Sequence, residues 1–216
     1  MPNVSLWSNV QIAVQSALSN AQAVSAVTKA NPAVATYVGT DMTNGDYLYL
    51  SSVQGMYQLD EKVVRAANVN SGGNTVELEG LDSALFDTFS SGNLQVVTFG
   101  SSLQIALDLS ASGGDFEQID ITTIHDRVRK QIPGAANPIV YSGNCIWDVA
   151  DAGFLALKAA SDLKAKRAIR MTFANNQKVV FTGYIGFTGL PTGSNQDKVQ
   201  TPFQITMFGT PTYYAS

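Results

Sequence analysis

Apolar and polar residues alternate with a period of two in several stretches of this chain. The clearest stretches are 10–14, 169–173 and 203–207, where every second residue is Val, Ile, Met or Phe. Alternation of this kind indicates strands with one buried face. Residues that favour turns separate such stretches, at 44–46, 71–74, 112–115 and 175–176. We therefore expect a mainly β fold built from antiparallel sheets.

One stretch departs from this period. Residues 148–166 contain no proline and are rich in Ala, Leu and Lys, which are good helix formers. Asp148 or Asp151 is suited to cap the N-terminus, and the basic residues near position 166 suit the C-terminal end of a helix dipole. The sequence thus predicts one α-helix flanking the β structure.

Residues 21–99 have the pattern of a separate unit. Short apolar runs alternate with turn signals every 8–12 residues, which is the spacing that small barrels require. The predicted strands of this unit lie at 34–37, 47–50, 62–69, 75–78 and 94–99. We expect a core made of residues 1–20 and 100–216, split by an accessory, barrel-like β module at 21–99.

Charge is sparse and uneven along the chain. Charged residues make up 14% of the sequence, and the net charge is −4. Phosphate binding needs clustered Lys and Arg, so this balance argues against a protein that grips DNA. Residues 1–120 hold 3 Lys/Arg and 12 Asp/Glu, whereas residues 121–216 hold 10 and 5. The asymmetry suits head-to-tail association between subunits, and it equally suits two folding modules in one chain or a chance distribution of charge.

No set of residues points to catalysis, a cofactor or a metal. Cys145 is the single cysteine, which excludes an internal disulfide and a site of several thiolates, and its apolar neighbours predict a buried, inert thiol. His125 is the single histidine and is expected on a surface or interface. The carboxylates at 77, 79, 82 and 87 do not follow calcium-loop spacing, so we expect a solvated face there. We expect no enzyme activity and no cofactor.

Membrane insertion is not expected either. The chain has no run of about 18 apolar residues, and its N-terminal residues lack the basic and apolar regions of a signal peptide. These features predict synthesis in a cytoplasm.

An ordered set of short motifs resembles the tail tube proteins of long-tailed bacteriophages. It begins with Ile-Asp-Ile-Thr-Thr at 119–123, continues with Pro-Gly at 133–134 and Ser-Gly-Asn at 142–144, and ends with Gly-Thr-Pro at 209–211. The predicted helix and hairpin strands fall between the last two motifs, in the order found in that family. The resemblance covers residues 100–216 and the strand near 10–17.

A second resemblance concerns the predicted module. Asn-Gly-Asp at 44–46, Gly-Met at 55–56 and Glu-Leu-Glu-Gly-Leu-Asp at 77–82 are similar to a small β module inserted in many phage virion proteins. Here it would interrupt the tube core after the first strand.

The family resemblance implies a fold and a function. The fold is two packed antiparallel sheets with one flanking α-helix, joined here to the inserted barrel-like module. The function is that of a structural virion protein: six subunits close a ring, and rings stack head to tail into the tail tube through which DNA passes to the host. The implied partners are further copies of the chain, the tape measure protein and tail-end proteins. The protein would be made in the bacterial host cytoplasm and would reside in the virion tail.

Particular residues are expected to serve this assembly. We expect the lumen to be lined by the polar phase of the inner strands: Gln11, Gln15, Thr172, Gln204 and Thr206. We expect ion pairs across a subunit boundary from the charged cluster Asp120, Asp126, Arg127, Arg129 and Lys130. Segments 1–9, 110–118, 130–138 and 210–216 are expected to become ordered only on docking.

Two other functions remain open at this stage. One is the inner tube of a contractile injection system, which shares the fold. The other is a decoration or adhesion protein that binds glycans through the aromatic residues of the 21–99 module, namely Tyr37, Tyr47, Tyr49 and Tyr57, although core packing is the favoured use for these rings.

Overall fold

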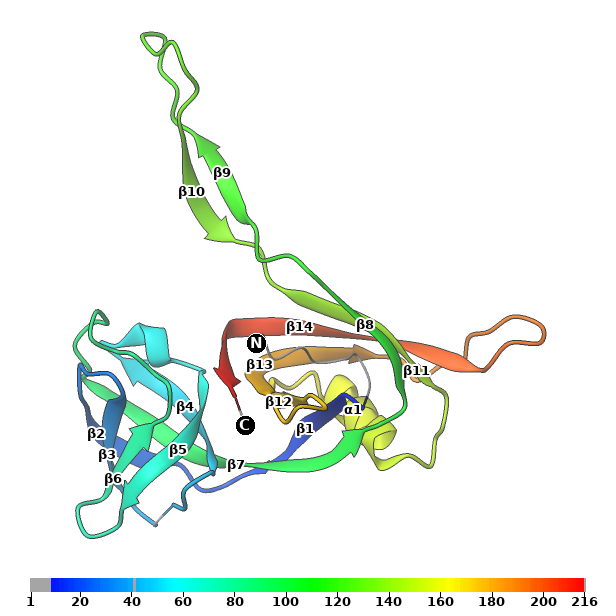
Figure 1. Cartoon of the computed structure of the whole chain (residues 1–216), viewed down its shortest axis with the longest axis horizontal. Coiled ribbons are helices and arrows are strands. Elements are labelled where there is room, and N and C mark those ends of the chain that lie inside the picture. The colour runs from blue at the N-terminus through cyan, green and yellow to red at the C-terminus, as the bar shows by residue number, and fades with distance from the viewer. Residues whose placement is uncertain (1–8, 41, 216) are drawn as a thin grey trace.

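The computed structural model describes residues 9–40 and 42–215 (Figure 1). This part of the chain is mainly β, with one α-helix, as expected. The strands are β1 (Gln11–Leu18), β2 (Gln22–Val27), β3 (Ala33–Val38), β4 (Tyr47–Gln54), β5 (Val63–Asn70), β6 (Thr75–Leu78), β7 (Ser91–Leu103), β8 (Ala106–Ser112), β9 (Phe116–Asp120), β10 (Gln131–Ala136), β11 (Val140–Ile146), β12 (Arg167–Thr172), β13 (Lys178–Phe187) and β14 (Gln200–Tyr214). The helices are the 3₁₀ turn η1 (Tyr57–Leu59) and α1 (Ala152–Leu163).

Six of these strands close into a small barrel. Their order is β2–β3–β6–β5–β4–β7, and β7 pairs back onto β2 to close the circle. Alternate residues point inward, so that Leu48, Leu50, Leu78 and Leu94 are fully buried in one cluster. The predicted barrel-like module is confirmed as a barrel. Closure removes the free edges that an open sheet of this size would leave.

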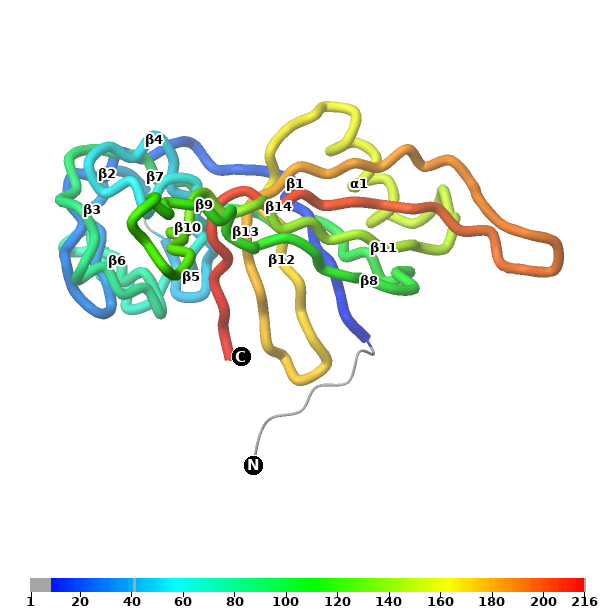
Figure 2. Tube along the Cα trace, turned by 90° about the horizontal axis from the view of Figure 1, so that it is seen from above, coloured from blue at the N-terminus to red at the C-terminus, as the bar shows by residue number. Residues whose placement is uncertain are grey.

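Strand β7 belongs to two structures at once. Its first half pairs with β2 and β4 in the barrel, and its second half, from Val97 to Leu103, pairs with β1. The barrel and the rest of the molecule therefore lie side by side and are connected by hydrogen-bonded strands (Figure 2). The sequence predicted a strand only at 94–99, because the polar residues that follow hide its continuation.

The remaining strands form a curved sheet. Its order is β7–β1–β12–β13–β14–β11–β8, and all neighbours are antiparallel. One face buries a second apolar cluster, to which Ile12 and Ile169 contribute from one end and Phe203 and Ile205 from the other. The packed β layers expected from the sequence are thus connected by hydrogen bonds into one continuous sheet that wraps round a common core.

Helix α1 covers this core. Asp151 caps it, because its Oδ1 accepts a hydrogen bond of 2.7 Å from the amide of Phe154. Phe154 and Leu157 are buried against the sheet. The helix is shorter than the predicted stretch 148–166, since it begins after this cap and ends where Lys164 adopts a left-handed φ of 48°.

A hairpin leaves the body as an arm. Strands β9 and β10 form a separate two-stranded sheet that continues the β8–β11 ribbon and points away from the rest of the molecule (Figure 1). At its base, Gly113 and Gly114 have φ of 89° and 86°, a conformation that glycine adopts at little cost. We call residues 113–138 the arm.

The segments expected to order only on docking have a different status in the structure. The stretches 110–118 and 130–138 lie mainly in β8, β9 and β10, and residues 210–214 are the end of β14. The structure shows these three segments paired within one chain. That they become ordered only on docking stays a prediction. Of the predicted N-terminal segment 1–9, residues 1–8 lie outside the described part.

The contact between Gly153 and β7 gives a prediction. A Cβ at Gly153 would lie 2.6 Å from the Cα of Leu103, so Gly153→Ala should destabilise the protein by about 1–3 kcal/mol, although Ala favours helices. Urea unfolding measures the change. The matched control is Gly186→Ala in β13, where the nearest atom would be 3.8 Å away and the change should stay within about 0.5 kcal/mol. Equal stability of the two variants would contradict the prediction.

Candidate assembly surfaces

The five predicted lumen residues share one face of the curved sheet. Gln11 and Thr172 are directly opposite each other in the β1–β12 pairing. Gln204 and Thr206 alternate with buried residues of β14, as their sequence pattern indicated. Gln15 follows Val14, which is buried in the core, so Gln15 lies on the same face, and its Oε1 accepts a hydrogen bond of 2.9 Å from the amide of Ala168. This is the face turned away from the core under α1.

The barrel covers part of this face. Tyr47 and Val63 of the barrel pack with Ala168, Val180 and Tyr214 of the sheet in a third buried cluster. Because Ala168 is buried in this contact, its partner Gln15 lies beside the barrel and not on open surface. The face is therefore divided into a part covered by the barrel and an open part formed by β8, β11, β14 and the end of β13.

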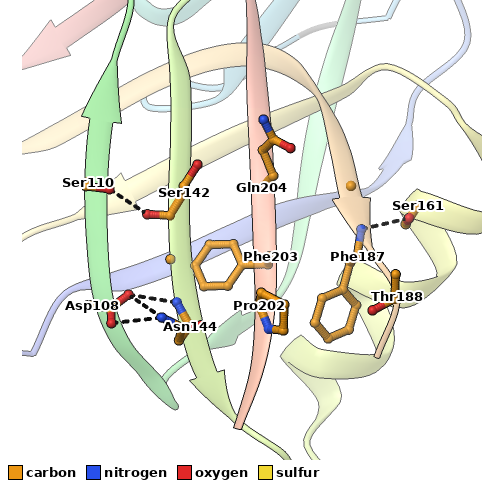
Figure 3. Close-up of a pocket in the computed structure, with 12 residues that line it drawn as sticks. Asp108, Ser110, Ser142, Asn144, Ser161, Phe187, Thr188, Pro202, Phe203 and Gln204 are labelled. Atoms are coloured by element: carbon orange, nitrogen blue, oxygen red, sulfur yellow. Dashed lines mark hydrogen bonds between the residues drawn. The ribbon is translucent and has the colours of Figure 1, made fainter. Parts of the chain in front are cut away.

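The open part is a shallow groove of about 800 Å³ with a mixed lining, in which Phe187, Pro202 and Phe203 lie beside polar side chains (Figure 3). Ser110, Ser142 and Gln204 form a row across β8, β11 and β14, and the hydroxyl of Ser110 donates to the carbonyl of Ser142 at 3.1 Å. Below this row, the Oδ1 of Asp108 accepts a hydrogen bond of 2.8 Å from the amide of Asn144. Among the described residues, no Lys or Arg lines the groove.

Sequence reasoning missed the contribution of β8 and β11 to this groove. The signal was present, because Asp108 and Ser110 alternate with Leu107 and Leu109. The glycines that follow at 113 and 114 led to an interpretation of the region as a loop.

The barrel is fixed to the sheet by polar contacts as well as apolar ones. The side chain of Arg65 donates two hydrogen bonds of 2.5 Å to Glu79, and its guanidinium lies 4.6 Å from the ring centre of Tyr214. The hydroxyl of Tyr214 accepts a hydrogen bond of 2.6 Å from the amide of Arg65. Glu79 was expected on a solvated face; its side chain is 33% exposed, and Arg65 on the neighbouring strand binds it.

The uneven charge of the sequence is used partly within the chain. Glu61 of the barrel forms an ion pair with Lys166, which immediately precedes β12. The ammonium of Lys166 also lies 3.9 Å from the ring centre of Phe208 in β14. An acidic residue of the barrel and a basic residue of the C-terminal half therefore pair within one chain. This ion pair supports the interpretation of the charge asymmetry as two modules of one chain.

All five predicted interface residues lie on the arm, in the loop at its tip or beside it. Asp126 forms an ion pair with Lys130, and hydrogen bonds from Lys130 and Thr123 lower the pKa of its carboxyl. Hydrogen bonds from Thr122 lower the pKa of Asp120. Arg127 and Arg129 are exposed at the tip. The structure thus places the whole cluster on the arm, where Asp120 and Asp126 already accept hydrogen bonds from neighbouring residues of the same chain.

The arm also carries apolar residues that sequence reasoning did not assign. Ile119 and Ile132 are paired across β9 and β10, and both remain nearly half exposed. Ile124 at the tip is 96% exposed, and Val128 is 75% exposed. Every residue of β9 is exposed, so the arm has no core of its own.

The described residues show no support for a metal site or a reactive thiol. No group of three or more His, Cys, Asp or Glu is placed to hold a metal ion in residues 9–40 and 42–215. Cys145 is buried, and desolvation raises the pKa of its thiol to about 11, as expected for an inert thiol. His125 is exposed on the arm. Within the same residues no helix is long and apolar enough to span a membrane.

The Arg65–Glu79 pair predicts a pH dependence. Hydrogen bonding to Arg65 holds the pKa of Glu79 below its ordinary value of about 4.3. The pair therefore stabilises the fold above that pH, and this stabilisation is lost as the pH falls through the lowered pKa. Glu79→Gln should therefore lower the free energy of unfolding at pH 7, and this deficit should shrink between about pH 5 and pH 3. Urea unfolding across this range tests it. Glu117→Gln, which changes an exposed carboxylate on the arm, should run parallel to the parent protein.

Comparison with known proteins gives one family match. The family profile described as phage tail tube protein, TTP, matches residues 54–216. The matched region includes β5, β6 and most of the other strands, from the end of β4 to the C-terminal residue. No curated protein matches the sequence significantly.

Proposed function

We propose that this chain, which belongs to the phage tail tube protein family and is a structural component of the virion tail, closes into rings that stack head to tail into the tube that conducts DNA. The number of subunits that the resemblance implies is six. Tape measure and tail-end proteins would contact the lumen and the ends of such a tube. The barrel, residues 21–99, would be a module inserted in a core made of 1–20 and 100–216, since the buried clusters divide close to these boundaries.

The observation that carries the proposal is the arm. A two-stranded hairpin is marginally stable by itself in water, and here it has no core. Its isoleucines are exposed on a projection that points away from the body (Figure 1). A second copy of the chain would cover them, and a contact between two different surfaces repeats along an axis, which gives an open filament.

Ring closure has its own support in β8. Within the described residues, β8 pairs with β11 on one side and with no strand on the other. An unpaired edge of this kind is a template for another strand. Pairing of β8 with a neighbouring subunit would continue the curved sheet around a ring and remove the edge.

The groove next to β8 suits a lumen surface, because no Lys or Arg lines it among the described residues. Gln204 and Thr206 lie on this open part, and the groove carries Asp108 and no cation among the described residues. Neutral and acidic groups give DNA phosphates no counter-charge to bind, so the DNA would slide past. Gln11 and Thr172 share this face as a pair on β1 and β12, and Gln15 would hold the module contact.

The proposal predicts the behaviour of an arm variant. The double substitution Ile119→Ser, Ile132→Ser removes exposed apolar area from the arm and should leave the thermal midpoint of the monomer unchanged, because the arm does not contribute to the buried clusters. It should raise the protein concentration needed for tube formation by about tenfold or more. Sedimentation and negative-stain electron microscopy of purified protein measure this.

The matched control is Leu85→Ser, which removes a 97% exposed apolar side chain from the barrel. This control should assemble like the parent protein. Normal tubes from the double variant, or equal impairment of the control, would count against stacking through the arm.

A further inference from the structure

A recess at the junction of the barrel and the sheet gathers more positive than negative charge. Arg65 enters it from β5, Arg170 from β12 and Lys178 from the start of β13, and its volume is about 610 Å³. Among the described residues that line it, Glu79 is the single carboxylate. Glu79 is bound by two hydrogen bonds to Arg65 and acts on Lys178 only through its charge. Among the described residues, neither Arg170 nor Lys178 forms an ion pair.

Arg170 is held in a fixed orientation by aromatic rings. Its guanidinium lies 4.6 Å from the ring centre of Phe99 and 5.5 Å from that of Tyr47. Its Nε is buried and has no hydrogen-bond partner among the described residues, so part of the charged group has lost water without gaining an acceptor. Stacked guanidinium groups are rigid donors whose planar fork matches an oxyanion.

Lys178 stands near this guanidinium without an ion pair. Among the described residues, no carboxylate lies within ion-pair distance of its ammonium. Burial, followed by the positive charges of Arg65 and Arg170, lowers the pKa of Lys178, and the charge of Glu79 offsets part of this effect. An anion in the recess would relieve this repulsion between like charges.

We propose that this recess is an oxyanion-binding site, and that in the assembled tube a carboxylate side chain of a second copy of the chain occupies it. The identity of the occupant rests on the proposed assembly, whereas the anion site itself does not. Each copy has 17 Asp and Glu against 13 Lys and Arg, so acidic groups without a partner are available on every neighbour. A single recess with two unpaired cations fits one anionic group, while DNA binding needs a row of cations along the backbone.

The site is tested first on the unassembled protein with inorganic phosphate and with acetate. Isothermal titration calorimetry at constant ionic strength should show binding of phosphate to the parent protein and weaker binding of acetate. Lys178→Gln should reduce phosphate affinity by about tenfold or more, because it removes one charge-assisted contact. Lys198→Gln, in the exposed loop between β13 and β14, should bind like the parent protein.

A second variant guards against an indirect effect of Lys178. Arg170→Gln should also abolish phosphate binding, with circular dichroism confirming that the fold is kept. Absence of phosphate binding by the parent protein, or unchanged binding by both site variants, would overturn the anion site whether or not the protein forms tubes.

The identity of the occupant is tested by assembly. Lys178→Glu should impair tube formation and Lys198→Glu should not, and phosphate should inhibit assembly of the parent protein. Normal tubes from Lys178→Glu, together with a loss of affinity for double-stranded DNA in fluorescence anisotropy, would identify nucleic-acid phosphate as the ligand and overturn the subunit contact. If the parent protein forms no tubes, the failure concerns the proposed function, and the calorimetry still decides the anion site.

Discussion

The arrangement of the molecule depends on the continuity of β7. One half of this strand closes the barrel by pairing with β2 and β4, and the other half extends the curved sheet by pairing with β1. Backbone hydrogen bonds along a strand fix direction as well as distance, so neither part can rotate without breaking pairs in the other. The apolar contact around Tyr47, Val180 and Tyr214 then buries the remaining gap between barrel and sheet. The polar contacts at Arg65 and Lys166 add to an arrangement of barrel and sheet that β7 already fixes.

The same sheet leaves two features incomplete. Strand β8 ends the order of the curved sheet, and the arm continues its ribbon beyond the point where a core exists to support it. Both features are adjacent in the chain, since β8 leads directly into β9 through Gly113 and Gly114. Among the described residues, these two features leave a strand edge and apolar side chains open to a partner, which fits membership of a family of structural tail proteins.

Local sequence patterns predicted the helix and strands better than they predicted the contacts between these elements. Alternation located β3, β5 and β6 closely, and the Ala- and Leu-rich stretch located α1, because these elements bury one face of a regular period. The arm was missed as a strand pair because Pro133 and Gly134 read as a turn. The pairing of Glu79 with Arg65 depends on the register of β5 and β6, which spacing in the sequence does not encode. The phase of Gln204 and Thr206 was predicted, but the cover that the barrel places near Gln15 is a tertiary contact between distant segments.

A strand shared by two modules also replaces the flexible linker that usually joins an accessory domain to its host. The barrel then has one fixed azimuth relative to the sheet in every copy. In any regular stack of subunits, it would repeat as a lobe at a constant angle and height. The rotation and rise between successive rings could then be measured directly from the positions of these lobes.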